Sequence, residues 1–177
     1  MNKTIVFDFD KTLTYKDSLK ELFLQEMTGF RYPLRIIYFF LALLSKSKVI
    51  TVRKEKEKMI SLLFDSDKSI FEEKCRSQAK TIKLNPVFNR VSGYLSDNDR
   101  VLLLSASSIY LLEEMFKDMN VEIIGTTFFF DKENIKRIKQ HPFGSEKYNL
   151  LISKGITEVD EMFYDSHNDE CLIPLCK

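Results

Sequence analysis

The sequence has no excess of charge of either sign. Its 177 residues contain 27 Lys and Arg against 26 Asp and Glu, which gives a formal net charge of +1. Proteins that attract nucleic acid through their overall electrostatic field carry a clear basic excess. We therefore expect no nucleic-acid partner, and only local charged patches remain available for binding.

Cysteine is scarce as well. The three residues, Cys75, Cys171 and Cys176, are an odd number and lack the regular spacing of a disulfide framework. This usage is typical of a reducing compartment, in which free thiols behave as small apolar side chains. The sequence predicts neither disulfides nor a metal site built from cysteine.

Long hydrophobic runs are missing too. The first apolar stretch is too short for a secretory signal and is interrupted by Asp8, so we expect a cytoplasmic protein. The segment "PLRIIYFFLALL", residues 33–44, contains Arg35 and is too short to cross a bilayer. It is either an ordinary buried helix or one that lies in a membrane interface, since the stretch "KSKVITVRKEKEK" that follows it is rich in Lys and Arg. The second interpretation predicts peripheral membrane contact through residues 31–48.

The sequence contains no internal repeat and no low-complexity tract. It has enough apolar residues to form a hydrophobic core, because 44% of its residues are hydrophobic and fifteen are Phe. This composition excludes fibrous and disordered classes, and the length fits one domain or one domain with an insertion. The oligomeric state cannot be read from the sequence.

Hydrophobic periodicity divides the chain into two kinds of segment. Residues 4–9 form a β-branched and aromatic run that predicts a buried strand. Four segments with helical spacing follow, with apolar faces in residues 19–27, 33–44, 52–64 and 70–82, and no strand is predicted among them. Four consecutive helices indicate a small bundle, inserted at residues 15–85 into a discontinuous core formed by residues 1–14 and 86–177.

The second half of the chain alternates between strands and helices. We predict a helix over 86–95, a strand over 100–105, a helix over 109–119, a strand over 121–125 and a hairpin over 126–140 that turns at 131–134. A helix capped by Ser145 and ending at Gly155 should follow, and then a strand that runs into carboxylates and a short helix. This alternation predicts an α/β fold with a Rossmann-like, doubly wound parallel sheet.

Polar residues fall at the predicted strand ends or at a helix start beside them. The clusters are Asp8 with Asp10, Ser105, Lys147, and Asp165 with Asp169. Ligands of open parallel sheets bind at the carboxyl ends of the strands, so these side chains are candidates for one site. Two neighbouring carboxylates repel each other unless a cation lies between them or one of them holds a proton, and Mg²⁺ prefers such oxygen ligands.

These residues resemble a known family. The motifs "DFDKTLT", an apolar strand ending in Ser105, "GSEK" and "DSHND" occur in this order and are similar to the four motifs of haloacid dehalogenase superfamily phosphatases. The helical insertion after the first motif resembles the C1 cap of subfamily IB, the phosphoserine phosphatase-like branch. Within it, "TLTYKDSLKELF" and "SASSIYL" are most similar to the phosphatidylglycerophosphatase C group.

The resemblance implies a function and a set of roles. It implies a Mg²⁺-dependent phosphomonoester hydrolase that acts on a small phosphorylated substrate through an aspartyl phosphate. Asp8 would be the nucleophile and Asp10 the proton donor, with Asp8, Asp165 and the backbone carbonyl of Asp10 as metal ligands. The other implied roles are phosphate binding by Thr12, Ser105, Ala106 and Lys147, support by Ser166, Asn168 and Asp169, and substrate selection from the cap by Asp17.

Each assignment has a structural alternative. Ser105 fits a helix N-cap, Asp165 with Ser166 could cap the last helix, and Asp17 could be the N-cap of the first inserted helix. Two residues also depart from the family pattern, because Lys11 and Tyr164 replace small residues. Two alternative functions remain open, namely a lipid phosphatase at a membrane surface and a catalytically silent module that binds a phosphorylated ligand.

Overall fold

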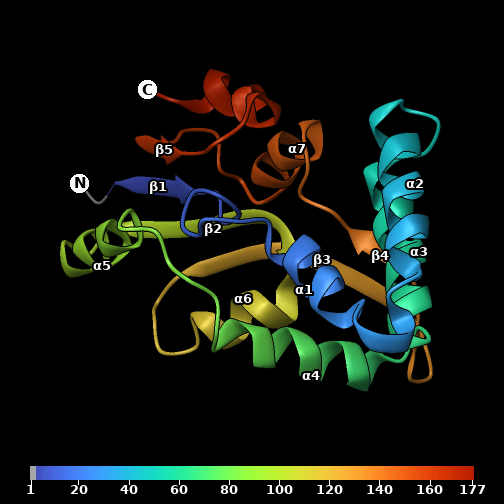
Figure 1. Ribbon diagram of the computed structural model, residues 1–177. Helices are drawn as coiled ribbons and strands as arrows, with labels where there is room; N and C mark the ends of the chain where they lie inside the picture. The colour runs from blue at the N-terminus through green and yellow to red at the C-terminus, as the bar shows by residue number, and fades with distance from the viewer. Residues whose placement is uncertain (1–2) are drawn as a thin grey trace.

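The computed structural model describes residues 3–177 (Figure 1). Its strands are β1 (Thr4–Phe7), β2 (Arg100–Ser108), β3 (Glu122–Asp131), β4 (Asn134–Gln140) and β5 (Glu161–Phe163). Its helices are α1 (Ser18–Glu26), α2 (Leu34–Lys46), α3 (Val52–Phe64), α4 (Lys68–Ala79), α5 (Phe88–Ser96), α6 (Ile109–Met115) and α7 (Ser145–Ser153), with 3-10 segments η1 (Gly29–Arg31) and η2 (His167–Leu175).

The five strands form one sheet in the order β4-β3-β2-β1-β5. Strands β3, β2, β1 and β5 run parallel, and β4 pairs antiparallel with β3. Phe7 at the end of β1 pairs with Leu103 on one side and with Phe163 on the other. Because parallel strands end at the same edge, this register brings the residues after Phe7, Leu103 and Phe163 together. The predicted Rossmann-like α/β fold is confirmed.

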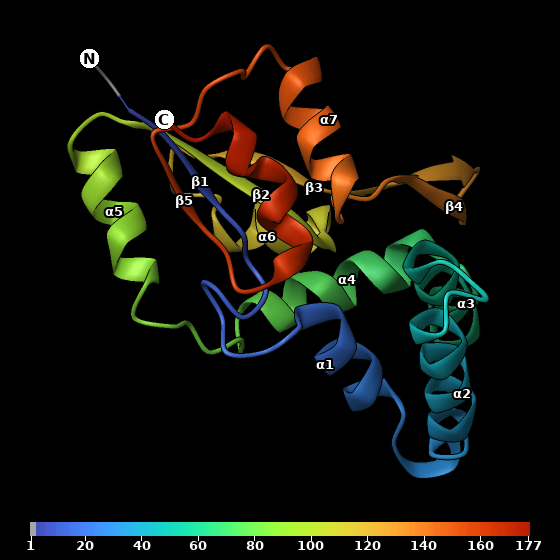
Figure 2. The same ribbon diagram turned by 90° about the horizontal axis from the view of Figure 1, so that it is seen from above.

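Helices cover both faces of the sheet (Figures 1 and 2). Alternate residues of β1 point to opposite sides, so that Ile5 and Phe7 join the core beneath α5 and α6, whereas Val6 packs with Leu151 of α7 and Leu172 of η2. The two cores make a three-layer arrangement that holds β1 and β2 rigidly. Loops that leave the ends of these two strands are therefore well placed to position side chains.

The four helices α1–α4 lie between β1 and β2 in the sequence, as predicted. The chain leaves and re-enters the sheet-forming part at one place, because Thr14 pairs with Leu84 and the backbone N–H of Asn85 donates to the carbonyl of Leu13 at 2.8 Å. The hydrophobic core beneath the sheet continues without interruption into these helices, where it includes Phe23, Phe64 and Phe71. The division at residues 14 and 86 remains a prediction.

Several boundaries differ from those predicted. The first strand ends at Phe7 rather than at residue 9, and β2 continues to Ser108. The segments predicted as a strand over 121–125 and the first arm of a hairpin are one continuous strand, β3. The prediction placed a break at Gly125, but this glycine has another cause: a Cβ there would lie 3.0 Å from a methyl carbon of Leu112 and 3.2 Å from the Cα of Ile109. Gly125 therefore permits α6 to pack closely on the sheet.

Candidate active site

A cavity of about 170 Å³ opens at the carboxyl ends of β1 and β2. It brings together every residue predicted for the site except Thr12, from all four motifs and from the start of α1. The predicted residues that line it are Asp8, Asp10, Asp17, Ser105, Ala106, Lys147, Asp165, Ser166, Asn168 and Asp169. The prediction that distant segments converge at one sheet edge is therefore confirmed.

Lys147 is the centre of a buried ion cluster. Its Nζ donates to Oδ1 of Asp8 at 2.8 Å and to Oδ2 of Asp169 at 2.7 Å. All three side chains are almost inaccessible to solvent, with 5%, 11% and 5% exposed for Lys147, Asp8 and Asp169. An ammonium group has three donors, so one remains for a further acceptor in the cavity. Asp169 thus contacts Lys147 directly, which fits the supporting role predicted for it.

The start of α7 places Lys147 at this position. Gly144 precedes the helix with φ of 56° and ψ of −138°, a conformation that side chains strongly disfavour. The helix then begins at Ser145, and the N–H of Lys147 donates to the carbonyl of Gly144 at 3.0 Å. The prediction that Ser145 caps this helix is wrong, because Gly144 occupies the cap position and no side chain caps it. The glycine turn allows the first turn of α7 to face the cavity.

Asp8 is fixed from two directions. Its backbone N–H donates to the carbonyl of Phe163 in the neighbouring strand β5 at 2.9 Å, and its carboxylate accepts from Lys147. Burial raises the pKa of Asp8 to about 6, although the Lys147 ammonium opposes this shift. The carboxylate is thus held at the cavity wall in an environment that penalises its charge.

Asp10 lies in a hydrogen-bond network that the sequence did not reveal. Its Oδ1 accepts from the backbone N–H of Ser18 and its Oδ2 accepts from the hydroxyl of Ser107, both at 2.8 Å. The Ser107 oxygen in turn accepts from the hydroxyls of Ser105 at 3.1 Å and Ser18 at 3.0 Å. Burial raises the pKa of Asp10 to about 7, and the nearby Asp17 carboxylate adds to the shift. This environment favours a carboxyl group that can carry a proton.

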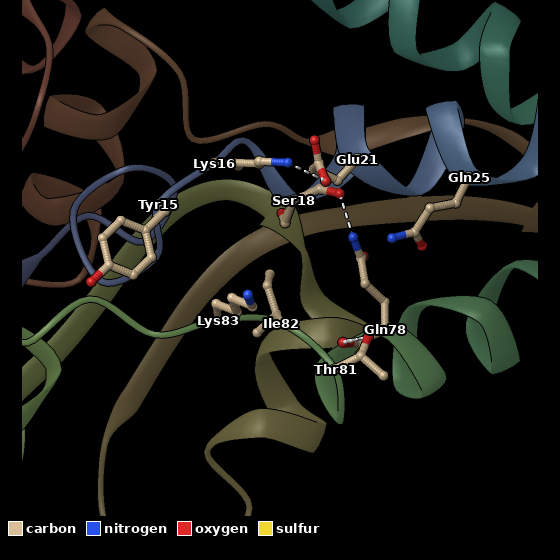
Figure 3. A pocket seen from close by; sticks show the side chains of 9 residues that line it. All are labelled: Tyr15, Lys16, Ser18, Glu21, Gln25, Gln78, Thr81, Ile82 and Lys83. Atoms are coloured by element: carbon tan, nitrogen blue, oxygen red, sulfur yellow. Dashed lines mark hydrogen bonds and ion pairs between the residues drawn. The ribbon is translucent and has the colours of Figure 1, made fainter.

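Ser18 is itself held by the last turns of α4. The side-chain amide of Gln78 donates to the carbonyl of Ser18 at 2.6 Å, and both residues are buried (Figure 3). These two residues line a second cavity of about 260 Å³ between α1 and the end of α4. That cavity contains none of the predicted site residues, so its part in the site is indirect: it borders the groups that position Asp10.

Helix α3 reaches into the cavity from the inserted block. Its Lys56 donates to the carbonyl of Ala106 at 3.1 Å, and Val52 lines the same wall. Burial lowers the pKa of Lys56, while the carboxylates of Asp17 and Asp10 oppose this effect. Sequence reasoning missed Lys56 because it lies in a run of alternating Lys and Glu, which usually marks a solvated helix face.

The remaining predicted residues have mixed outcomes. Asp17 is the N-cap of α1, since its Oδ1 accepts from the N–H of Lys20 at 2.8 Å, and it also lines the cavity. Ser166 caps η2. Ser105 is not a helix N-cap, because β2 continues past it and α6 begins only at Ile109. Thr12 lies outside the cavity, and its buried hydroxyl makes no hydrogen bond to any residue of the described range 3–177.

The carboxylates at the cavity fit a hard divalent cation held with few protein ligands. Within residues 3–177, no group of three or more His, Cys, Asp and Glu side chains is arranged to hold a metal. Asp8 and Asp165 line one cavity from adjacent strand ends, and the nearest cation to Asp165 is Lys11, whose Nζ lies 3.9 Å from its Oδ2. Mg²⁺ is usually bound by one or two carboxylates, with waters and substrate oxygens completing its shell, and this donor set suits it.

Comparison with known proteins agrees with this arrangement. The family model of haloacid dehalogenase-like hydrolases matches residues 5–154. The chain belongs to that family. The match extends from β1 to α7 and so includes the insertion between β1 and β2 and three of the four motifs. No curated protein sequence matches this hydrolase.

Solved structures share the fold of this haloacid dehalogenase-like hydrolase. A protein of unknown function from Bordetella pertussis Tohama I superposes with a TM-score of 0.73 at 17% identity, over 88% of this chain and 75% of that chain. A phosphoserine phosphohydrolase-like protein from Francisella tularensis gives 0.69 at 16% identity, over 96% and 81%. A phospho-aspartyl intermediate analogue of phosphoserine phosphatase gives 0.64 at 14% identity, over 99% and 83%.

Proposed function

We propose that this hydrolase is a Mg²⁺-dependent phosphatase that cleaves the phosphomonoester of a small metabolite through an aspartyl phosphate. One observation carries the proposal: Lys147 lies within 2.8 Å of Asp8 and 2.7 Å of Asp169, in a cavity that also contains Asp10, Ser105 and Asp165. The cavity thus combines a candidate nucleophile, a candidate proton donor and a fixed cation. The phosphoserine phosphatase in the phospho-aspartyl state shares the fold and supports the same chemistry.

The residues divide the reaction into two displacements. Asp8 attacks phosphorus, the bond from phosphorus to the ester oxygen breaks, and Asp10 gives its proton to the leaving alcohol. Asp10 then removes a proton from a water that attacks the same phosphorus, which releases phosphate and restores Asp8. The third donor of Lys147, with Ser105 and the backbone of Ala106, would hold the phosphoryl oxygens.

Asp8, Asp165 and the backbone carbonyl of Asp10 are the groups that would hold Mg²⁺. When bound, the ion neutralises charge on the phosphoryl oxygens and between the two carboxylates. Lys11 is the side chain that would compete with the ion for Asp165.

The size of the cavity favours a small ester. Its volume is about 170 Å³, and α3 covers it with Lys56 and Val52. A phospholipid headgroup with its acyl chains would require α3 to move, which makes hydrolysis of lipid phosphates the less favoured alternative. Asp17 and Lys56 offer one carboxylate and one amine to the alcohol part of the substrate.

The decisive experiment replaces the nucleophile. Asp8→Asn should abolish hydrolysis of p-nitrophenyl phosphate, because an amide cannot attack phosphorus at a useful rate. Asp97→Asn makes the same chemical change at an exposed position at the end of α5 and should leave turnover unchanged. Circular dichroism checks that both variants are folded, and turnover retained by folded Asp8→Asn would refute the assignment.

Metal removal tests the cofactor independently. Chelation should stop turnover, and added Mg²⁺ should restore it. A ligand present at a hundred times its Kd stabilises the folded state by about 2.7 kcal/mol, so Mg²⁺ should also raise Tm by about 5–10 °C. Asp165→Asn should lose this rise in Tm, whereas Asp97→Asn should keep it. An equal rise in both variants would place the ion elsewhere.

A panel of phosphate esters then separates the candidate functions. Amino-acid, sugar, nucleotide and lipid phosphates should be tested, and the proposal expects turnover among the small soluble esters. Turnover confined to the lipid esters would favour the lipid phosphatase. A flat panel combined with Mg²⁺-dependent binding of phosphate esters would favour a silent binding module.

A further inference from the structure

Helix α2 exposes an apolar stripe to solvent. Ile36, Phe39, Phe40 and Leu43 recur at helical spacing, and their residues are 75%, 71%, 58% and 53% exposed. Phe30 and Tyr32 before the helix and Val49 after it are also exposed. We call these seven residues the α2 apolar face. Single exposed apolar residues are ordinary, but seven within residues 30–49, four of them aromatic, are typical of an interaction surface.

The opposite side of α2 already has a partner. Leu41 is buried there, and Leu34 and Tyr38 pack against the core, where Tyr38 meets the ring of Phe23 edge-on. The helix is therefore apolar on two sides, although only one side faces protein. Figure 2 shows α2 at the outer edge of the molecule, with α3 between it and the hairpin of β3 and β4.

Structural features fix the neighbouring aromatic residues in place. Arg35 donates to the carbonyls of Met27 and Leu24 and lies over the ring of Tyr32, 4.9 Å from its centroid. Arg31 donates to the carbonyl of Leu63 and lies 5.7 Å from the centroid of Phe30. The α2 apolar face is thus presented by a preorganised segment, which reduces the entropy lost on binding.

The segment that carries this face contains basic residues and no acidic ones, although Arg31 lies 4.0 Å from the carboxylate of Glu26 just before it. Residues 27–54 contain six Lys and Arg and no Asp or Glu. Lys46 and Lys48 at the end of α2 are exposed, and neither forms an ion pair with another residue in the described part of the chain. An apolar helix face flanked by lysines complements a surface that is both apolar and anionic.

We propose that the α2 apolar face binds peripherally to the surface of an anionic phospholipid membrane, with Ile36, Phe39, Phe40 and Leu43 among the upper acyl carbons and Lys46 and Lys48 at the headgroups. An interfacial helix has this combination of a strong apolar side, aromatic residues and flanking lysines. No helix in residues 3–177 has the length and apolar character needed to cross a bilayer. The helix lies on the membrane.

A second copy of the chain fits this face less well. A twofold interface pairs the same surface with itself, so that Lys46 and Lys48 of each copy would face a segment, residues 27–54, that contains six Lys and Arg and no carboxylate. The membrane has no such conflict. Docking through α2 also leaves the catalytic cavity accessible, because α3 rather than α2 lines it.

Flotation with vesicles tests the proposal. The probes are vesicles of phosphatidylcholine alone and vesicles that contain one-third phosphatidylglycerol, at low salt. Wild-type protein should float with the anionic vesicles and remain at the bottom with the neutral ones. Phe39→Ser with Phe40→Ser should weaken binding at least tenfold, and Lys46→Glu with Lys48→Glu should remove the preference for anionic lipid.

Matched variants separate the α2 apolar face from general hydrophobicity. Ile36→Ser should weaken flotation several-fold, whereas Ile173→Ser, an equivalent change at an exposed position in η2, should have no effect. Melting curves confirm that the variants are folded. The proposal is overturned if wild-type protein stays at the bottom of the gradient with anionic vesicles. It is also overturned if wild-type protein is a dimer and the double variant Phe39→Ser with Phe40→Ser is a monomer.

The test does not depend on the proposed phosphatase activity. Asp8→Asn should float like wild type, and the α2 variants should hydrolyse p-nitrophenyl phosphate at the wild-type rate without vesicles. Protein that floats but does not hydrolyse would refute the proposed function alone. Protein that hydrolyses but does not float would refute the membrane proposal alone.

Discussion

The hydroxyl groups beside Asp10 form a directed chain. Ser107 can donate only one hydrogen bond, and it donates to Asp10 while accepting from Ser18 and Ser105. This arrangement fixes the Asp10 carboxyl group and links it to the predicted phosphate-binding serine. We therefore infer that Ser107 positions Asp10 for its proposed proton transfer.

Ser107→Ala should impair the proton transfer that Asp10 is proposed to perform. General acid catalysis contributes about 10²–10⁴-fold, so partial misplacement of the acid should lower kcat roughly tenfold on alkyl phosphates. The loss should be smaller on p-nitrophenyl phosphate, whose leaving oxygen needs little protonation. Comparison of kcat for the two esters measures the effect.

Ser108→Ala is the matched control for this change. Ser108 is as buried as Ser107, but its hydroxyl lies outside the network around Asp10. Ser108→Ala should leave the ratio of kcat on alkyl phosphates to kcat on p-nitrophenyl phosphate unchanged. A uniform loss on both esters in Ser107→Ala would indicate a structural effect and contradict the positioning role.

The sequence could indicate which side chains lie together where those side chains follow strands. Asp8 and Asp165 could be placed because the ends of neighbouring parallel strands must meet, whatever the helices do. Ser107, Ser18 and Lys56 could not be placed in this way. Their contacts with Asp10 and Ala106 depend on how α1 and α3 pack against the end of β2 and on how β2 approaches the loop that carries Asp10, and no local pattern encodes these distances.

Among the secondary-structure elements, the hairpin of β3 and β4 connects the sheet to the inserted helices. The N–H of Lys68 donates to the carbonyl of Glu133 at 2.9 Å, and the N–H of Ile135 donates to the carbonyl of Ser66 at 2.7 Å. Further along β4, the N–H of Ile138 donates to Oε1 of Glu57 in α3 at 2.7 Å. The edge strand β4 and its turn are thus covered by a backbone donor at the start of α4, a backbone acceptor in the turn between α3 and α4, and a side-chain acceptor from α3.

Glu57→Ala should destabilise the protein through this edge. It leaves the N–H of Ile138 without its acceptor, and an unsatisfied donor at a partly buried position costs about 1–3 kcal/mol. Urea unfolding should report this loss as a lower midpoint at unchanged slope. Glu55→Ala is the matched control, at a position two residues away in the same helix. The side chain of Glu55 makes no hydrogen bond or ion pair within residues 3–177. The urea midpoint of this variant should therefore be close to that of wild type. Equal midpoints for the two variants would contradict the edge-covering role.

The hairpin also shows why the sequence misplaced an element. Alternation and the turn at residues 131–134 predicted the hairpin, and β3 and β4 do pair antiparallel around that turn. The break predicted at Gly125 was wrong because local rules assign a glycine within an apolar run to a turn or bulge, whereas this glycine accommodates α6. Gly125 is required by the packing of α6 against β3, and a local turn pattern cannot indicate that contact.

Across the whole molecule, α3 joins the inserted helices to the core on both sides of the cavity. Lys56 contacts Ala106 in the last part of β2, and Arg53 donates to Oε2 of Glu146 in α7 at 2.6 Å. Oε1 of Glu146 accepts from the N–H of His141, which holds the carboxylate toward α3. The Arg53–Glu146 ion pair therefore links α3 to α7. These two helices must separate if a substrate is to enter beneath α3.

Removing this ion pair should destabilise the closed arrangement of α3 over bound substrate, and so weaken substrate binding without abolishing chemistry. About one-third of each side chain is exposed, and exposed pairs contribute about 0.2–1 kcal/mol, so Arg53→Ala should raise KM by at most about fivefold with little change in kcat. Salt screens such a pair, and the ratio of variant to wild-type KM should therefore approach one between 50 mM and 500 mM salt. Arg137→Ala, which removes an arginine that lies over the ring of Phe129 rather than at the cavity, should give a ratio of one at both salt concentrations. A lower KM in Arg53→Ala than in wild type would contradict this prediction. It would mean that the ion pair hinders substrate entry more than it stabilises bound substrate.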